Sequence, residues 1–145
     1  MKKYKIVIDT NVIASALRSK RGYSYRLLSI LDDERKQVSI SVPVILEYED
    51  VIKREKLNIK YKKSEIDDFL DFICLIGEQR KIHYLWRPIL KDRKDDMFFE
   101  LAVESESNFI VTFNKRDFEG TEKFGIKILA PKEFLKVIGE KIWAP

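Results

Sequence analysis

The feature that most constrains the fold is the alternation of short strand-like segments with longer segments of helical periodicity. Strand-like runs, mostly rich in β-branched residues, are expected at residues 6–8, 38–42, 81–85, 108–112 and 127–129. Helices are expected at residues 12–17, 25–31, 43–55, 64–77, 95–106 and 131–139, with a turn or short helix at 115–119. This alternation predicts a single α/β domain over residues 1–145, built on a mostly parallel sheet.

Composition places the chain among ordinary globular domains. Its 145 residues suit one domain with an adequate core, since 45% of them are hydrophobic and 36% are charged. No apolar run approaches the roughly 18 residues that a membrane span needs. The basic residues 2–3 precede an apolar run that stops at Asp9, which is too short for a signal peptide. We therefore expect a cytoplasmic protein with no membrane segment.

The first strand-like run ends in a carboxylate, Asp9, which is followed by Thr10 and Asn11. An ionised carboxylate is costly to bury unless it is paired or bound to a metal. An acid at the end of a buried strand therefore indicates a functional site. The alternative is that Asp9 or Thr10 caps the next helix, because Asp, Thr and Asn are preferred N-cap residues.

The chain has one cysteine, Cys74, and one histidine, His83. Cys74 lies in apolar sequence and is expected in the core, while His83 lies in an expected strand, where a structural role is favoured. A single thiol cannot form a disulfide frame or a thiolate zinc site. A single histidine likewise disfavours catalytic pairs of histidines and histidine-rich metal sites. Any chemistry must therefore be carried by carboxylates.

Acids recur after the first four expected strands. In chain order they are Asp9, Glu47, the group Asp92, Asp95 and Asp96, and finally Asp117. Each has an ordinary structural explanation, such as a favourable place at a helix N-terminus or a turn cap. However, the carboxyl ends of parallel strands meet at one edge of a sheet, where ligands bind. We therefore expect the acids to gather at that edge.

Gathered carboxylates repel one another and raise one another's pKa unless a cation is present. Oxygen ligands without His or Cys suit Mg²⁺ or Mn²⁺. Such a metal can activate a water molecule and stabilise the leaving oxygen in phosphodiester cleavage. Periodicity does not distinguish Glu47 from Glu49, because both flank the apolar stripe of the helix at 43–55.

Five segments, taken in order, carry a family resemblance. They are IVIDTNV at 6–12, PVILEY at 43–48, DRKDDMF at 92–98, IVTFNKRDF at 110–118 and KILAPKEFL at 127–135. Each is short, but their order and spacing over nearly the whole chain resemble the PIN domain family. The resemblance is to the toxin components of bacterial and archaeal toxin–antitoxin pairs in particular.

The resemblance implies a Rossmann-like, three-layer fold with a five-stranded, mostly parallel sheet whose middle strand is the first. It also implies a metal-dependent ribonuclease that uses Mg²⁺ or Mn²⁺. The implied acidic cluster is Asp9, Glu47, Asp96 and Asp117, of which Asp9, Asp96 and Asp117 hold the metal. Supporting residues are Thr10, Asn11, Asp95, Thr112 and Asn114, with Asp95 the alternative to Asp96. Many relatives carry an acid in place of Asn114, so we expect one tightly held ion and leave a second open.

The resemblance further implies an RNA substrate, a homodimer, and a small antitoxin that inserts residues near the site. The net charge of +4 permits a polyanionic partner. Basic residues expected near the mouth of the site could hold RNA phosphates, or could simply form a solvated surface. They are Arg18, Lys20, Arg21, Lys115 and Arg116.

Two other functions are compatible with parts of the pattern. The first is a module that binds RNA or protein through a catalytically weak PIN-like site. The second is an aspartate-nucleophile phosphatase, which also begins with an apolar strand that ends in Asp. That chemistry normally needs a second acid two residues further on, where this chain has Asn11.

Overall fold

A parallel five-stranded sheet forms the centre of the computed structural model, which describes residues 3–54, 60–82 and 93–141. The strands are β1 (Tyr4–Ile8), β2 (Lys36–Ile40), β3 (Glu78–Gln79), β4 (Phe109–Val111) and β5 (Lys127–Leu129). Their order is β3-β2-β1-β4-β5, and every neighbouring pair is parallel. The fold class expected from the sequence is confirmed, with β1 in the middle.

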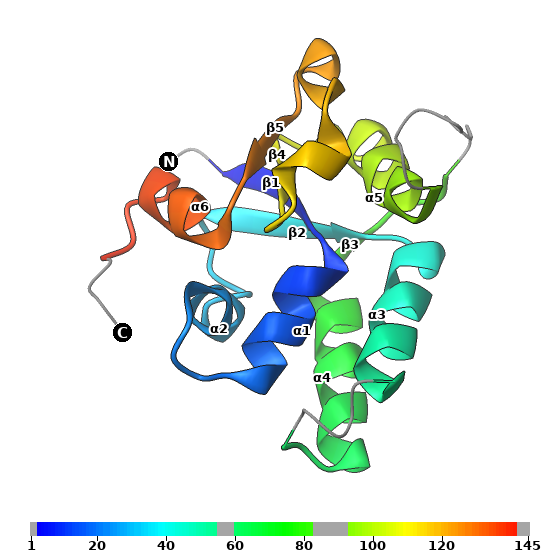
Figure 1. Cartoon of the computed structure of the whole chain (residues 1–145), viewed down its shortest axis with the longest axis vertical. Helices are drawn as coiled ribbons and strands as arrows, with labels where there is room; N and C mark the ends of the chain where they lie inside the picture. Colours follow the sequence, from blue (N-terminus) through cyan, green and yellow to red (C-terminus); the bar gives the residue numbers. More distant parts are fainter. Residues whose placement is uncertain (1–2, 55–59, 83–92, 142–145) are drawn as a thin grey trace.

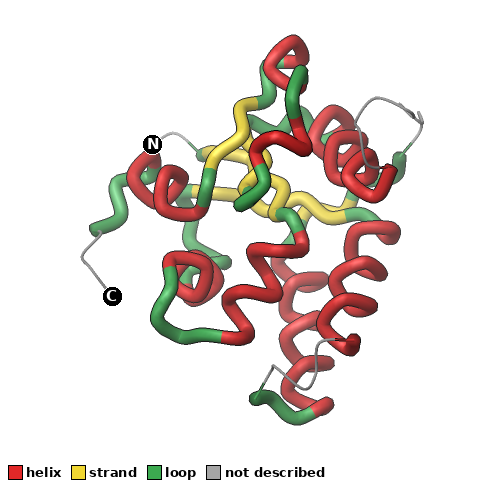
Figure 2. Tube along the Cα trace, in the orientation of Figure 1, coloured by secondary structure: helices red, strands yellow, loops and turns green. Residues whose placement is uncertain are grey.

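Six helices flank the sheet (Figure 1). They are α1 (Thr10–Arg18), α2 (Tyr23–Ser29), α3 (Val42–Arg54), α4 (Lys63–Ile76), α5 (Arg93–Glu104) and α6 (Pro131–Val137). Two short 3₁₀ helices, η2 (Lys115–Phe118) and η3 (Thr121–Phe124), follow β4. Helices α1 to α4 gather on one side of the strands, whereas α5 and the 3₁₀ helices lie on the other (Figure 2). The result is the three-layer arrangement that a buried parallel sheet requires.

Strand β1 is covered on both faces. Ile6 and Val7 point to opposite sides of the sheet, and both are completely buried. Burying side chains of this size stabilises the folded state by about 1.5–3 kcal/mol each. Val7 pairs with Ile110 of β4, and Ile8 pairs with Val111. This register places the residues that follow the two strands, Asp9 and Thr112, side by side.

The third strand is not where the sequence pattern placed it. The expected strand was at residues 81–85, but β3 is Glu78–Gln79, and residues 81 and 82 lie outside any strand. The reason is Gly77, which ends α4 as expected. A Cβ there would lie 2.8 Å from the Ile73 carbonyl oxygen and 3.0 Å from the Ile40 side chain. The missing side chain lets the chain meet β2 at once, so pairing begins at Glu78. His83 lies outside the described residues.

Helix α1 begins two residues earlier than the sequence pattern suggested, at Thr10. Thr10 and Asn11 are therefore inside the helix, and Asp9 is its N-cap residue. Cys74, which the sequence placed in the core, is only half-buried and packs against the outside of the core. Within the described parts of the chain, no helix is both long enough and apolar enough to cross a membrane.

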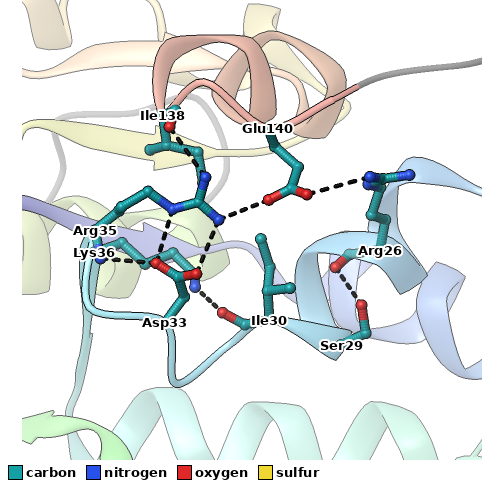
Figure 3. Close-up of polar contacts among 8 residues, drawn as sticks. All are labelled: Arg26, Ser29, Ile30, Asp33, Arg35, Lys36, Ile138 and Glu140. Carbon is teal, nitrogen blue, oxygen red and sulfur yellow. Dashed lines mark hydrogen bonds and ion pairs between the residues drawn. The ribbon is translucent and has the colours of Figure 1, made fainter.

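At the start of β2, a network of charged side chains ties distant parts of the chain together (Figure 3). Arg35 donates through Nε and Nη2 to the two carboxylate oxygens of Asp33, each at 2.8 Å. Its Nη2 also lies 2.6 Å from Glu140, which follows α6, and Arg26 of α2 binds the other Glu140 oxygen at 3.2 Å. The neighbouring Lys36 amine donates to the Ile30 carbonyl. The network fastens α2 and the end of α6 to the sheet.

Candidate active site

The ends of β1 and β4 bring Asp9 and Thr112 into contact. The Asp9 backbone N–H donates to the Val111 carbonyl at 2.9 Å, which continues the ladder past the last strand residue. The Thr112 hydroxyl donates to Asp9 Oδ2 at 2.7 Å. Both residues are buried, with 6% of Asp9 and none of Thr112 exposed. The register of the two central strands therefore fixes the carboxylate at the edge of the sheet.

The direction of the Thr112 hydroxyl is set by two further bonds. The Asn114 backbone N–H donates to its oxygen at 3.0 Å, and the Asn11 amide nitrogen does so at 3.4 Å. A hydroxyl has one proton to give and two lone pairs. Because both lone pairs are used, the proton can only point toward Asp9. The four residues thus hold one carboxylate orientation.

Electrostatics disfavour the charged form of Asp9. Burial is the largest effect and raises its pKa from 3.8 to about 6, against the hydrogen bonds from the Thr112 hydroxyl and the Thr10 backbone. The negative charges of Asp117 and Glu47 raise the pKa further. Asp9 occupies the N-cap position of α1 but makes no side-chain capping bond. Helix capping alone therefore does not explain a carboxylate at this place.

Glu47 and Asp117 approach Asp9 from two different elements. Glu47 is half-buried in α3, and Asp117 is half-buried in η2, directly after β4. Next to Glu47, Tyr48 is completely buried, and its hydroxyl donates to the Ile8 carbonyl. Burial and the Asp9 charge raise the pKa of Tyr48, so its phenol stays protonated and keeps donating. Tyr48 thus anchors α3 beside the end of β1.

Helix α5 contributes the third acidic group. Asp96 lies in its first turn and is completely buried, whereas its neighbour Asp95 is half-buried. Glu100, one helical turn further along, is also buried, at 2% exposed. Helix α5 packs against β1, β4 and η2, so these acids lie on the layer that covers the acidic edge. Asp92 lies outside the described residues.

The acids lie in one region but do not form a preorganised metal-binding site among the described residues. Across residues 3–54, 60–82 and 93–141, no three His, Cys, Asp or Glu side chains come close enough to hold a metal ion together. Mg²⁺ keeps several waters and binds only one or two carboxylates directly. The side chains at this edge suit such water-assisted binding, because the atoms they offer to a metal are oxygens. One of them is the buried Thr10 hydroxyl, which has no hydrogen-bond partner among the described residues. The residues present therefore fit a hard divalent cation held partly through water.

The basic residues considered in the sequence divide into two groups. Lys115 and Arg116 are exposed in η2, next to Asp117. Arg18 ends α1, and Lys20 and Arg21 follow it. Helix α1 runs from the end of β1 away from the sheet (Figure 1), and its length separates Arg18 from the Asp9 end by about 12 Å. The second group therefore does not line the acidic edge.

Sequence reasoning passed over two residues that matter here. Tyr48 belongs to the apolar stripe of the helix expected at 43–55, and nothing in the pattern shows that its hydroxyl reaches Ile8. Glu100 was not singled out, although its spacing of four residues from Asp96 places the two acids on one helix face. That spacing is the signal that could have found it.

Comparison with known proteins gives the family. Residues 5–116 match the PIN domain family. Because the match spans most of the sequence, the chain belongs to the PIN domain family. The match begins in β1 and ends in η2, so it includes Asp9, Glu47 and Asp96 and stops one residue before Asp117.

A similar solved structure is that of VapBC2 from Rickettsia felis bound to a DNA fragment from its promoter. The two chains are 15% identical, with a TM-score of 0.58 over 86% of this chain and 98% of the other. A likeness at this identity shows the shared fold. No curated protein matches the sequence.

Proposed function

We propose that the protein is a metal-dependent endoribonuclease and the toxin of a toxin–antitoxin pair. The observation that carries the proposal is the buried Asp9 carboxylate, held in one orientation by Thr112 while Glu47 and Asp117 add negative charge nearby. A folded chain keeps such an arrangement at a cost, which a bound cation would offset. Membership of the PIN domain family supports the same function.

Asp9, Asp96 and Asp117 are the residues proposed to hold Mg²⁺ or Mn²⁺. When bound, such an ion supplies an activated water and stabilises charge on the phosphodiester. Thr112, Asn11 and Asn114 keep the Asp9 carboxylate turned toward the site, and Asp95 stays the alternative to Asp96.

Glu47 is left outside the metal set. Its half-buried carboxylate remains in contact with water, so we assign it the role of accepting the proton of the attacking water. Thr10 contributes its buried hydroxyl at the start of α1. The exposed Lys115 and Arg116, in the same turn as Asp117, contact RNA phosphates beside the acids.

The proposal includes protein partners. The structurally similar VapBC2 of Rickettsia felis is described as a complex on promoter DNA, and this likeness supports a small antitoxin partner for the present chain. We propose that the toxin is a cytoplasmic homodimer, which size-exclusion chromatography with light scattering would test.

The test is cleavage of single-stranded RNA by the purified chain with Mg²⁺, with Mn²⁺ and with EDTA. Cleavage is expected with either metal and not with EDTA, and Asp9→Asn is expected to abolish it. The matched control is Asp50→Asn on α3, where an exposed carboxylate pairs with Arg54 at 3.0 Å. Equal cleavage by wild type and Asp9→Asn would sink the assignment of Asp9.

The second candidate is a catalytically weak PIN-like module that binds RNA or protein. It is favoured by one observation: within the described residues the acids do not form a preassembled metal-binding group. Calorimetry separates the two candidates. Mn²⁺ binding to wild type but not to Asp9→Asn supports the nuclease, whereas intact RNA affinity without any Mn²⁺ binding supports the module.

A further inference from the structure

A polar cavity of about 560 Å³ lies beyond the far end of α1, away from Asp9. Its size is that of a site for a small ligand or a nucleotide. It lies against α2, which packs beside α6 (Figure 1). The residues that give the cavity its character are Lys20, Arg21, Tyr23, Tyr25, Arg26 and Glu140.

The charge of this cavity is positive and concentrated on two side chains. Glu140, the one acid among its lining residues, is already bound by Arg26 at 3.2 Å and by Arg35 at 2.6 Å. Lys20 and Arg21 are exposed, and no carboxylate in the described parts of the chain pairs with either of them. The cavity therefore presents two cations that no carboxylate of the described residues neutralises, which favours an anionic ligand.

A line of contacts connects this cavity to the acidic edge. Lys132, in the first turn of α6, lies with its amine 5.5 Å from the centre of the Tyr23 ring. The next residue, Glu133, pairs at 2.5 Å with Lys115, which belongs to the same 3₁₀ turn as Asp117. Two lysines thus lie between the acids and the wall of the cavity, Lys115 in an ion pair with Glu133 and Lys132 over the Tyr23 ring. A polyanion can follow such a row, whereas a single small anion needs only one end of it.

We propose that the cavity binds the flank of a single-stranded RNA whose scissile phosphate lies at the acidic edge. Lys20 and Arg21 contact phosphate oxygens, and the rings of Tyr23 and Tyr25 offer faces for a base. The inference rests on the proposed function, because it takes RNA as the ligand. Helix α1, which lies between Asp9 and the pair Lys20 and Arg21, is itself about 12 Å long, or about four stacked nucleotides.

The experiment measures RNA affinity by fluorescence anisotropy in EDTA, where metal-dependent cleavage does not interfere. The probe is a labelled single-stranded oligoribonucleotide of about twelve nucleotides, three times the span of about four. The double variant Lys20→Ala/Arg21→Ala is expected to bind it roughly tenfold more weakly. The slope of log affinity against log salt should fall by about 1.4, or ~0.7 for each lost phosphate contact.

Two matched variants control for net charge and for folding. Lys53→Ala/Arg54→Ala removes the same charge at the end of α3, where both side chains pair with acids one turn earlier, and should keep wild-type affinity. Lys20→Arg/Arg21→Lys keeps both charges and should also bind normally. Thermal unfolding at the wild-type temperature would show that the exposed substitutions leave the fold intact.

Three outcomes would overturn the inference: wild-type affinity in Lys20→Ala/Arg21→Ala, an equal loss in both alanine variants, or displacement of the probe by low concentrations of AMP, which would assign the cavity to a free nucleotide. The binding measurement also separates this inference from the proposed function. A protein that binds RNA through the cavity but never cleaves it contradicts the nuclease alone. A protein that cleaves RNA but binds equally well without Lys20 and Arg21 contradicts the cavity alone.

Discussion

Carboxylates at the two ends of the sheet have opposite surroundings: a cation pairs with Asp33 at one end, whereas none among the described residues pairs with Asp9 at the other. At the start of β2, Asp33 receives two bonds from the Arg35 side chain, while Glu140 is shared by Arg35 and Arg26 (Figure 3). At the end of β1, the Asp9 carboxylate receives a hydroxyl bond, and no Lys or Arg among the described residues forms an ion pair with it. The same chemical group is thus neutralised at one end and left charged beside other acids at the opposite end.

This difference shows in the pKa values of the two aspartates. Hydrogen bonds from Arg35 hold the pKa of Asp33 well below its usual range, whereas burial raises the pKa of Asp9 to about 6. A paired carboxylate is part of the scaffold, since its partner is supplied by the protein. A carboxylate left without a cation stabilises the protein only when something else supplies the charge. The comparison therefore supports a structural role for Asp33 and the proposed ligand-binding role for Asp9.

The largest expected effect comes from replacing aspartate by asparagine, once at Asp9 and once at Asp33. Asp9→Asn should lower RNA cleavage roughly 100- to 1,000-fold, because the proposed metal site would lose its central carboxylate. The same variant should be more stable to urea without metal by roughly 1–3 kcal/mol, because a buried charge is gone. Asp33→Asn should cleave RNA at the wild-type rate and be less stable. Loss of both activity and stability in Asp9→Asn would contradict the comparison.

The next effect concerns the orientation of Asp9. Thr112→Val removes the bond to Asp9 and leaves the Asn114 N–H and the Asn11 amide without their acceptor. Cleavage at saturating Mn²⁺ should fall about 10- to 100-fold, and urea unfolding should show a loss of about 1–3 kcal/mol. Thr112→Ser keeps a hydroxyl at this position and should retain most of the cleavage activity and most of the stability.

Thr121→Val is the control for that experiment. Its buried hydroxyl donates to the Ile126 carbonyl at 3.3 Å, in the 3₁₀ region after Asp117. This variant should lose stability without losing activity. A wild-type cleavage rate in Thr112→Val would show that the hydroxyl does not position Asp9 for the reaction.

At the paired end, Arg35→Ala should destabilise the protein by about 1–2 kcal/mol, because two half-buried carboxylates lose charge-assisted bonds. Cleavage by the folded variant should be unchanged. Arg54→Ala breaks an ion pair whose side chains are 59% and 61% exposed, and it should change stability by less than about 0.5 kcal/mol. Equal urea midpoints for Arg35→Ala and Arg54→Ala would show that the network does not stabilise the protein more than an exposed ion pair does.

The last expected effect appears only at alkaline pH and concerns Lys36, which is 2% exposed. Burial lowers the pKa of its amine from 10.5 to about 8. Between these values the folded protein binds fewer protons than the unfolded chain, so stability rises as the pH increases from 8 to 10.5. Relative to Lys36→Met, wild type should gain up to about 3 kcal/mol over this window in urea titrations, because one unit of pKa corresponds to about 1.4 kcal/mol. A constant difference between the two proteins across the window would show that Lys36 does not titrate differently on folding.

The sequence was most informative where local pattern and topology agree. An apolar run that ends in Asp9, and a later strand that is followed by Asp117, predict acids at one edge of a parallel sheet, whereas the family resemblance alone implied Thr112 beside them. The direction of the Thr112 proton was out of reach, because it depends on bonds from Asn11 and Asn114 that no periodicity encodes. Strand β3 was misplaced because its two residues, Glu78 and Gln79, carry no strand signal, and pairing there depends on the missing side chain of Gly77.

The ion-pair network was invisible for a different reason. Arg35 and Glu140 are 105 positions apart, and charged residues at such separations give no local signal. The same limit applied to Lys20 and Arg21, which the sequence placed near the acids. Only the direction and length of α1 show that they line another cavity. Local chemistry was therefore predictable, whereas contacts set by the path of the chain were not.

The central position of β1 has a consequence for how the molecule fluctuates. This strand is bonded to β2 on one side and β4 on the other, and its apolar side chains are fully buried. Amide hydrogens in such a strand exchange with solvent only when the whole domain unfolds, while those of edge strands exchange through partial opening. Asp9 therefore follows directly after the strand whose amide hydrogens are expected to exchange most slowly. Fluctuations that detach β3 or β5 leave the Asp9–Thr112 bond in place, so the site persists in partly open states.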